Sequence, residues 1–128
     1  MYNSKNELFS LIDWRPNFGT IDHAGDVYYD LGKLYAGLIV HFNNIKDESK
    51  ISFDLYENSV QLGDCNSENV SVFTTSYERW IKENSYDLSK VKLIASIVLL
   101  GISCLHEKIQ SDFIYFSGRR LLDESRKF

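Results

Sequence analysis

Three aspartates near the start of the sequence are of the residue type that phosphoryl transfer from ATP uses to hold its metal ion. Asp13 follows the apolar run Leu8–Ile12, and Asp26 and Asp30 come after an intervening loop. A carboxylate at the end of a buried strand is placed to face a cleft. There it can hold a Mg²⁺ ion against nucleotide phosphates, because the cation bridges their oxygens and offsets their charge. The pattern favours Asp13 as a metal ligand, although a single aspartate at a strand end or helix start is more often structural.

The residues around these aspartates resemble a family of enzymes. Ile12-Asp13-Trp14, a loop, and then Gly25-Asp26 with Tyr29-Asp30-Leu31 are similar to the I-D-W … G-D-x-x-Y-D-L segment of the aminoglycoside and choline phosphotransferases. The resemblance implies that Asp13 binds Mg²⁺ and that Asp26 and Asp30 support the site from a second layer. It also makes Arg15 a candidate contact for phosphate or substrate.

The family's other motifs do not occur in these 128 residues. Its catalytic loop has an H-G-D type motif followed by an asparagine that also serves the metal. His23-Ala24-Gly25-Asp26 comes after Asp13 instead of before it and lacks the asparagine. We therefore expect residues 1–128 to be part of a phosphotransferase domain, its C-terminal lobe, without the ATP-binding lobe or a catalytic residue. In the complete protein, the resemblance implies Mg²⁺ and ATP as cofactors.

The expected function is part of an ATP-dependent kinase acting on a hydroxyl of a small polar substrate, such as a sugar, an aminoglycoside or a choline-like molecule. Relatives with this segment imply a role in surface-polysaccharide biosynthesis. The expected partners are the small-molecule substrate and a complementary N-terminal lobe or fused domain. Two alternatives are a non-enzymatic helical remnant or interaction module that binds a complementary chain, and an accidental match in a small α+β protein.

The elements that must position the aspartates begin with a predicted β-hairpin. Tyr2 and Glu7–Trp14 are two extended segments on either side of a polar turn. Because a two-stranded hairpin alone is marginal in water, we expect further chain before Met1 or strands supplied by a partner. After the loop Arg15–Gly25, Asp26 is the predicted N-cap of a helix.

One apolar stripe of this helix is predicted to face the core: Tyr28, Leu31, Tyr35, Leu38, Ile39 and Phe42. Gly32 and Gly37 each weaken the helix by about 1 kcal/mol relative to alanine, which predicts close packing at both positions.

The remaining sequence predicts a second hairpin and three further helices. Lys50–Leu62 alternates as a surface hairpin with its turn at Asn58-Ser59. A helix with Phe73, Tyr77, Trp80 and Ile81 on one face follows. The next, from Leu88 to Leu105, is capped by Asp87 and apolar enough to run through the middle of a bundle. The last begins at Ser111 or Asp112 and reaches Asp123.

The predicted fold class is thus α+β: an N-terminal β-hairpin followed by a mostly helical bundle with a small hairpin insertion. This is the form that a truncated C-terminal lobe of a protein-kinase-like fold would have. Tyr28, Tyr35, Phe73, Tyr77 and Trp80 could form an aromatic cage for a quaternary ammonium, but their helical spacing favours core positions. Arg119, Arg120, Arg126 and Lys127 are either an anion contact or a solvated face.

The composition of the sequence limits the partners and the cellular compartment that can be expected. The 14 basic residues against 18 acidic ones and the absence of a basic stretch argue against nucleic acid as a partner. The most apolar segment, Leu93–Leu105, is shorter than the roughly 20 residues needed to span a bilayer, so no membrane partner is expected. Cys65 and Cys104 lack metal or disulfide spacing, which favours free thiols in the cytoplasm. The oligomeric state is left open.

Overall fold

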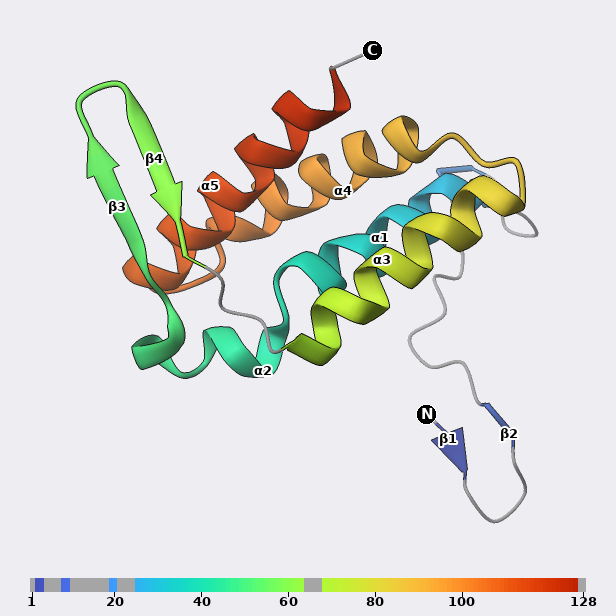
Figure 1. Cartoon of the computed structure of the whole chain (residues 1–128), viewed down its shortest axis with the longest axis horizontal. Helices are drawn as coiled ribbons and strands as arrows, with labels where there is room; N and C mark the ends of the chain where they lie inside the picture. The colour runs from blue at the N-terminus through green and yellow to red at the C-terminus, as the bar shows by residue number, and fades with distance from the viewer. Residues whose placement is uncertain (1, 4–7, 10–18, 21–24, 64–67, 127–128) are drawn as a thin grey trace.

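The computed structural model of the chain describes residues 2–3, 8–9, 19–20, 25–63 and 68–126. It is an α+β fold in which two small antiparallel hairpins accompany a mostly helical body (Figure 1). This confirms the predicted fold class. In Figure 1 the N-terminal hairpin lies apart from the helices, whereas the second hairpin lies beside the last helix.

The two hairpins form where the sequence predicts them. In the first, β1 (Tyr2–Asn3) pairs with β2 (Leu8–Phe9), and in the second, β3 (Phe53–Tyr56) pairs with β4 (Ser59–Leu62). The second turn comes one residue earlier than predicted, because Ser59 pairs with Tyr56 and leaves Glu57 and Asn58 as the loop. The predicted continuation of the first hairpin to Trp14 lies outside the described residues.

The helix after the loop is α1 (Val27–Ile39), and Asp26 caps it as predicted. The Asp26 backbone is extended, and its carboxylate accepts a hydrogen bond from the Tyr28 amide at 2.9 Å. The chain becomes extended at Val40 and continues into the short helices α2 (Phe42–Ile45) and η1 (Glu48–Lys50). The predicted stripe that extended to Phe42 is therefore too long.

The two glycines of α1 differ in how closely other residues pack against them. A Cβ atom on Gly32 would lie 2.6 Å from Ile94 Cγ2 and 3.2 Å from the Ala95 backbone nitrogen, so α1 and the helix containing Ile94 approach closely there. A Cβ atom on Gly37 would have no neighbour within 4 Å. The prediction of close packing is confirmed at Gly32 and wrong at Gly37.

Helix α3 (Glu68–Glu83) ends in a left-handed turn. Ser85 has φ of 62°, the Ser85 amide donates to the Lys82 carbonyl, and the Tyr86 amide donates to the Ile81 carbonyl. This is the Schellman hydrogen-bond pattern, which usually has glycine at the left-handed position. The turn sends the chain back along α1, where Asp87 caps the next helix by accepting from the Ser89 and Lys90 amides.

The last two helices are α4 (Leu88–Ser103) and α5 (Lys108–Ser125), and they pack most extensively against each other. Small residues let them approach: a Cβ atom on Gly118 would lie 3.2 Å from the Ser96 carbonyl oxygen. Helix α5 begins at Lys108, earlier than the predicted Ser111 or Asp112. Its N-cap, Glu107, makes no side-chain capping hydrogen bond.

The core lies between α1, α3, α4 and α5. Its buried members are mainly aliphatic: Leu31, Ala36, Val40, Ile45, Ile51, Ile81, Val91, Ala95, Leu99, Ile114 and Leu121, with Tyr35 and Phe113. Burying each large side chain of this kind stabilises the fold by about 1.5 to 3 kcal/mol.

One face of α4 remains open. The exposed fractions of Leu93 and Ile97 are 39% and 59%, and that of Leu105, in the turn after the helix, is 78%. Contacts of α4 with α1, α5 and α3 confirm that this helix runs through the middle of the bundle, but the prediction that it is buried all round is wrong at Leu93 and Ile97. Within the described residues, no helix combines the length and apolar character that crossing a membrane requires.

Candidate functional site

The structure describes two of the four residues predicted for the phosphotransfer site. Asp13 and Arg15 lie outside the described residues. Asp26 and Asp30 are both exposed at the N-terminal end of α1, one turn apart. One carboxylate oxygen of Asp26 is used in capping the helix. Asp30 lies in the first turn, where a negative charge is favoured by the helix dipole.

The fit of this aspartate pair to a magnesium ion can be judged from its oxygens. Mg²⁺ prefers oxygen ligands and is commonly bound through one or two carboxylates together with substrate phosphates. Two neighbouring exposed carboxylates fit a supporting position beside such an ion. Among the described residues, no group of three or more histidine, cysteine, aspartate or glutamate side chains is placed to hold a metal.

A second candidate site is a cavity of about 370 Å³ that is bordered by the C-terminal end of α1, by α3 and α5, and by the end of β4. Its lining is rich in hydroxyl and charged groups: Ser71, Thr74, Thr75, Glu78, Ser117 and Arg120, with Ile39, Leu62, Gly63 and Phe113. Polar side chains from two helices converge here, which is typical of ligand sites between helices.

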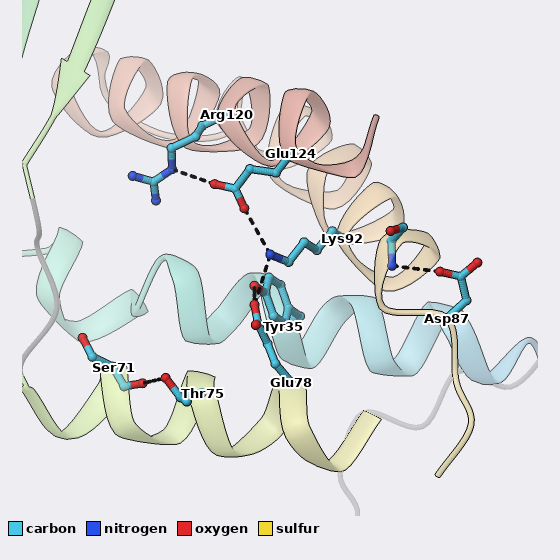
Figure 2. Close-up of polar contacts among 9 residues, drawn as sticks. Tyr35, Ser71, Thr75, Glu78, Asp87, Lys92, Arg120 and Glu124 are labelled. Carbon is cyan, nitrogen blue, oxygen red and sulfur yellow. Dashed lines mark hydrogen bonds and ion pairs between the residues drawn. The ribbon is translucent and has the colours of Figure 1, made fainter. Parts of the chain in front are cut away.

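Glu78 connects the cavity to a row of charges, drawn in Figure 2. Tyr35 donates a hydrogen bond of 2.5 Å to Glu78 Oε1, and Lys92 Nζ lies 3.1 Å from the same oxygen. Lys92 also contacts Glu124 at 3.2 Å, and Glu124 in turn lies 3.9 Å from Arg120 Nε. Both contacts of Glu78 involve Oε1. No partner of Oε2 is found among the residues that the structure describes.

These contacts set the charges of the row. Burial raises the pKa of Glu78, but hydrogen bonds from Tyr35 and Lys92 outweigh this effect and place it below its ordinary value. Burial lowers the pKa of Lys92, but Glu78 and Glu124 raise it above the ordinary lysine value. Burial and the hydrogen bond to Glu78 raise the pKa of Tyr35 strongly. At neutral pH the row therefore has ionised Glu78 and Lys92 with a neutral tyrosine.

The hydroxyl groups of α3 at the cavity are oriented by their own helix. Thr74 Oγ1 donates to the Val70 carbonyl at 2.9 Å, and Thr75 Oγ1 donates to the Ser71 carbonyl at 3.0 Å. Because each proton is used within the helix, the lone pairs of these oxygens are left to accept from a ligand.

Ser117 differs from the other buried serines. Its exposed fraction is 1%, yet within the described part of the chain its hydroxyl has no hydrogen-bond partner. The other buried serines each donate to a carbonyl three residues earlier: Ser96 to Leu93, Ser103 to Leu100 and Ser125 to Leu122. A hydroxyl that lines a cavity and makes no hydrogen bond within the described part of the chain is available to a molecule inside it.

The aromatic residues do not form an open cage. Tyr77 and Trp80 stack with centroids 6.1 Å apart, Trp80 stacks on Tyr86 at 6.0 Å, and Tyr28 meets Tyr86 edge-on at 5.9 Å. The rings fill one another's faces, which agrees with the core prediction for Tyr28 and Tyr77. Phe73 and Trp80 have exposed fractions of 63% and 44%, so their predicted core positions are wrong.

The sequence pattern indicates Arg120 only as part of a basic end, and it does not indicate Glu78 or Ser117 as site residues. A signal for them exists, because Ser71, Thr74, Thr75 and Glu78 recur at the spacing of one helix face. Ser117 and Arg120 are likewise three residues apart on α5. Polar stripes of this kind also occur on solvated faces, so only the structure brings the two together.

The cavity is distant from the pair formed by Asp26 and Asp30. Asp26 and Ile39 lie at opposite ends of α1, which separates them by roughly 20 Å at a rise of about 1.5 Å per residue. A group transferred beside Asp26 is therefore too far from a molecule bound at Ile39 to react with it.

Comparisons of this chain with protein-family models, with curated proteins and with solved structures gave no match. The resemblance of the segment around Asp13 and Asp26 to the phosphotransferases therefore stays a prediction. The candidate sites rest on the residues and their geometry alone.

Proposed function

We propose that this chain is part of an ATP-dependent phosphotransferase that acts on a hydroxyl of a small polar molecule in the cytoplasm. The observation that carries the proposal is the spacing of Asp13, Asp26 and Asp30 with their neighbours Trp14 and Tyr29. The exposure of Asp26 and Asp30 together at one end of α1 supports it, because a second segment carrying the nucleotide can approach them there.

In this proposal each of the four site residues has a different role. Asp13 holds Mg²⁺, which supplies charge stabilisation for the transferred phosphoryl group when bound. Asp26 fixes the start of α1, and Asp30 adds negative charge beside the ion. Arg15 contacts phosphate or substrate. The base that accepts the hydroxyl proton and the loop that grips the phosphates come from another segment or chain. Without them we expect negligible turnover, because positioning supplies most of the catalysis.

Metal binding tests this function directly. Mn²⁺ in place of Mg²⁺ broadens the NMR signals of nuclei close to it, so it reports where an ion binds in the presence of ATP. We expect broadening around Asp26 and Asp30 in the wild type, its loss in Asp13→Asn, and weakening of several-fold in Asp30→Asn. Asp54→Asn, an exposed aspartate on β3, is the matched control and should leave the pattern unchanged. Equal broadening in the wild type and Asp13→Asn would contradict the proposal.

A second candidate function is that of an interaction module binding a complementary chain. The observation that favours it is the exposure of Leu93 and Ile97, one turn apart on α4. Exposed apolar side chains that lie together on a surface commonly mark protein contacts. An assay of ATP consumption separates the two functions once a complementary segment is added: turnover supports the kinase, and binding without turnover supports the module.

A further inference from the structure

The cavity between α3 and α5 has the dimensions of a small-molecule site. Its volume of about 370 Å³ lies within the range of ligand pockets, and side chains from both helices line it. Its lining includes Ser71 of α3 and Arg120 of α5. A site of this size takes one small molecule and not a polypeptide segment.

The charges at the cavity favour a neutral ligand. The row of Glu78, Lys92, Glu124 and Arg120 contains two negative and two positive groups, each in contact with the next. An anion placed against Arg120 would also approach the Glu78 carboxylate. A cation placed against Glu78 would approach Arg120 and Lys92. Either charge therefore meets repulsion that a neutral molecule avoids.

The hydrogen-bonding groups that line the cavity favour a ligand that both donates and accepts hydrogen bonds. Glu78 Oε2 and the lone pairs of Thr74 and Thr75 accept, whereas the Arg120 guanidinium only donates. The buried Ser117 hydroxyl can do either. Alcohol groups carry a donor and an acceptor on one atom, so several of them on a small frame match this lining.

The remaining wall is apolar. Phe113, Leu62 and Ile39 also line the cavity. A sugar ring or a sugar alcohol presents C–H groups as well as hydroxyls, and its C–H groups can pack on such a wall. A small polar molecule without a carbon frame, such as an inorganic anion, would leave these side chains without a contact.

We propose that this cavity is a binding site for a small, neutral, polyhydroxylated molecule, such as a monosaccharide or a sugar alcohol, recognised by Glu78, Ser117 and Arg120. The site lies far along α1 from Asp26. It therefore does not depend on the proposed phosphotransfer, and the neutral character of its ligand excludes aminoglycosides and choline from it.

The ligand class can be tested by titrating the ¹⁵N-labelled chain with matched probes. Glucose, galactose and xylitol are the neutral probes, glucose 6-phosphate is the anionic one, and glucosamine is the cationic one. We expect the neutral probes to shift the amide signals of residues 71–78 and 113–120, with at least one binding about tenfold more tightly than either charged probe. No shift in these segments from any neutral probe, or tighter binding of a charged probe, overturns the proposal.

Two variants test the assignment to this cavity. Ser117→Ala removes the hydroxyl without a partner, and it should weaken neutral-probe binding about three- to tenfold, the effect of one hydrogen bond. Ser125→Ala is the matched control on the same helix, because that buried hydroxyl already donates to Leu122. It should bind as the wild type does.

Ser71→Trp fills the cavity from an exposed position and should abolish binding while the thermal midpoint is retained. Equal affinities for Ser117→Ala and Ser125→Ala, or unchanged binding by a folded Ser71→Trp, would place the ligand elsewhere and refute the site.

Discussion

At the scale of single residues, Glu78 has the most connections. It accepts from Tyr35, pairs with Lys92 and lines the cavity, so three elements meet at one carboxylate. Exposed ion pairs contribute little to stability, but this one is partly buried and reinforced by a hydrogen bond from a buried tyrosine. Glu78 therefore ties the stability of the helical body to the shape of the candidate binding site.

The pKa values of this group predict how stability depends on pH. The pKa of Glu78 is lowered by folding, so its contribution is present above the ordinary glutamate pKa of 4.5 and is lost as pH falls through the folded value. The pKa of Lys92 is raised, so its contribution is present below 10.5 and is lost as pH rises through the folded value. The free energy of unfolding should therefore be highest between these limits.

Glu78→Gln tests this reading. At pH 7 we expect a loss of about 1.5 kcal/mol in urea unfolding, the scale of a hydrogen bond to a charged group, and a flatter acid limb. Glu83→Gln, an exposed glutamate at the end of the same helix, should change neither. The same acid limb in Glu78→Gln as in the wild type would show that another carboxylate causes it.

At the scale of elements, the closest helix contact is that of α1 with α4 at Gly32. Gly32→Ala should destabilise the chain by about 1 to 3 kcal/mol, because the added methyl group overlaps Ile94 and exceeds the gain in helix propensity. Gly37→Ala, five residues along the same helix, meets no neighbour and should stabilise it by up to about 1 kcal/mol. Chemical unfolding of both variants measures the difference. Equal effects would mean that α1 and α4 are further apart than the structure has them.

Local signals explain which elements were predictable from the sequence. Asp26 and Asp87 cap α1 and α4 by accepting hydrogen bonds from amides two or three residues later, an interaction that is encoded locally. The start of α5 was misplaced because Glu107 makes no such bond. The open face of α4 was missed because apolar periodicity identifies a buried helix without specifying its neighbours.

In the candidate sites too, features set by neighbouring residues were predictable from the sequence and features set by helix packing were not. The capping role of Asp26 follows from residues beside it in the chain. The contacts of Lys92 with Glu78 and Glu124 join residues of three different helices, and no spacing in the sequence specifies them. The cavity is a product of how α1, α3 and α5 pack, so its residues could be recognised only once the helices were in place.

At the scale of the whole molecule, the chain has a net negative charge and also exposes apolar side chains on one face of α4. Without a partner this face is exposed to water, and burying it in a second copy would be favourable. We expect the isolated chain to self-associate at high concentration, as measured by sedimentation velocity.

Ile97→Glu should weaken this association by about tenfold or more, because it places a charge in the middle of the apolar face. Val72→Glu replaces an equally exposed residue on α3 and should leave the association unchanged. A wild-type chain that stays monomeric under these conditions would show that this face does not pair with a second copy.

The stacked rings at the end of α3 have a practical consequence. Trp80 lies between Tyr77 and Tyr86, and Tyr28 of α1 meets the far ring. Light absorbed by these tyrosines is passed to the indole, and the share that comes from Tyr28 falls when α1 separates from α3, whereas Tyr77 stays on the same helix as Trp80. In a Trp14→Phe background, which leaves Trp80 as the one tryptophan of the sequence, loss of Tyr28 transfer gives an optical signal, without any added label, for the docking of α1 against the turn between α3 and α4.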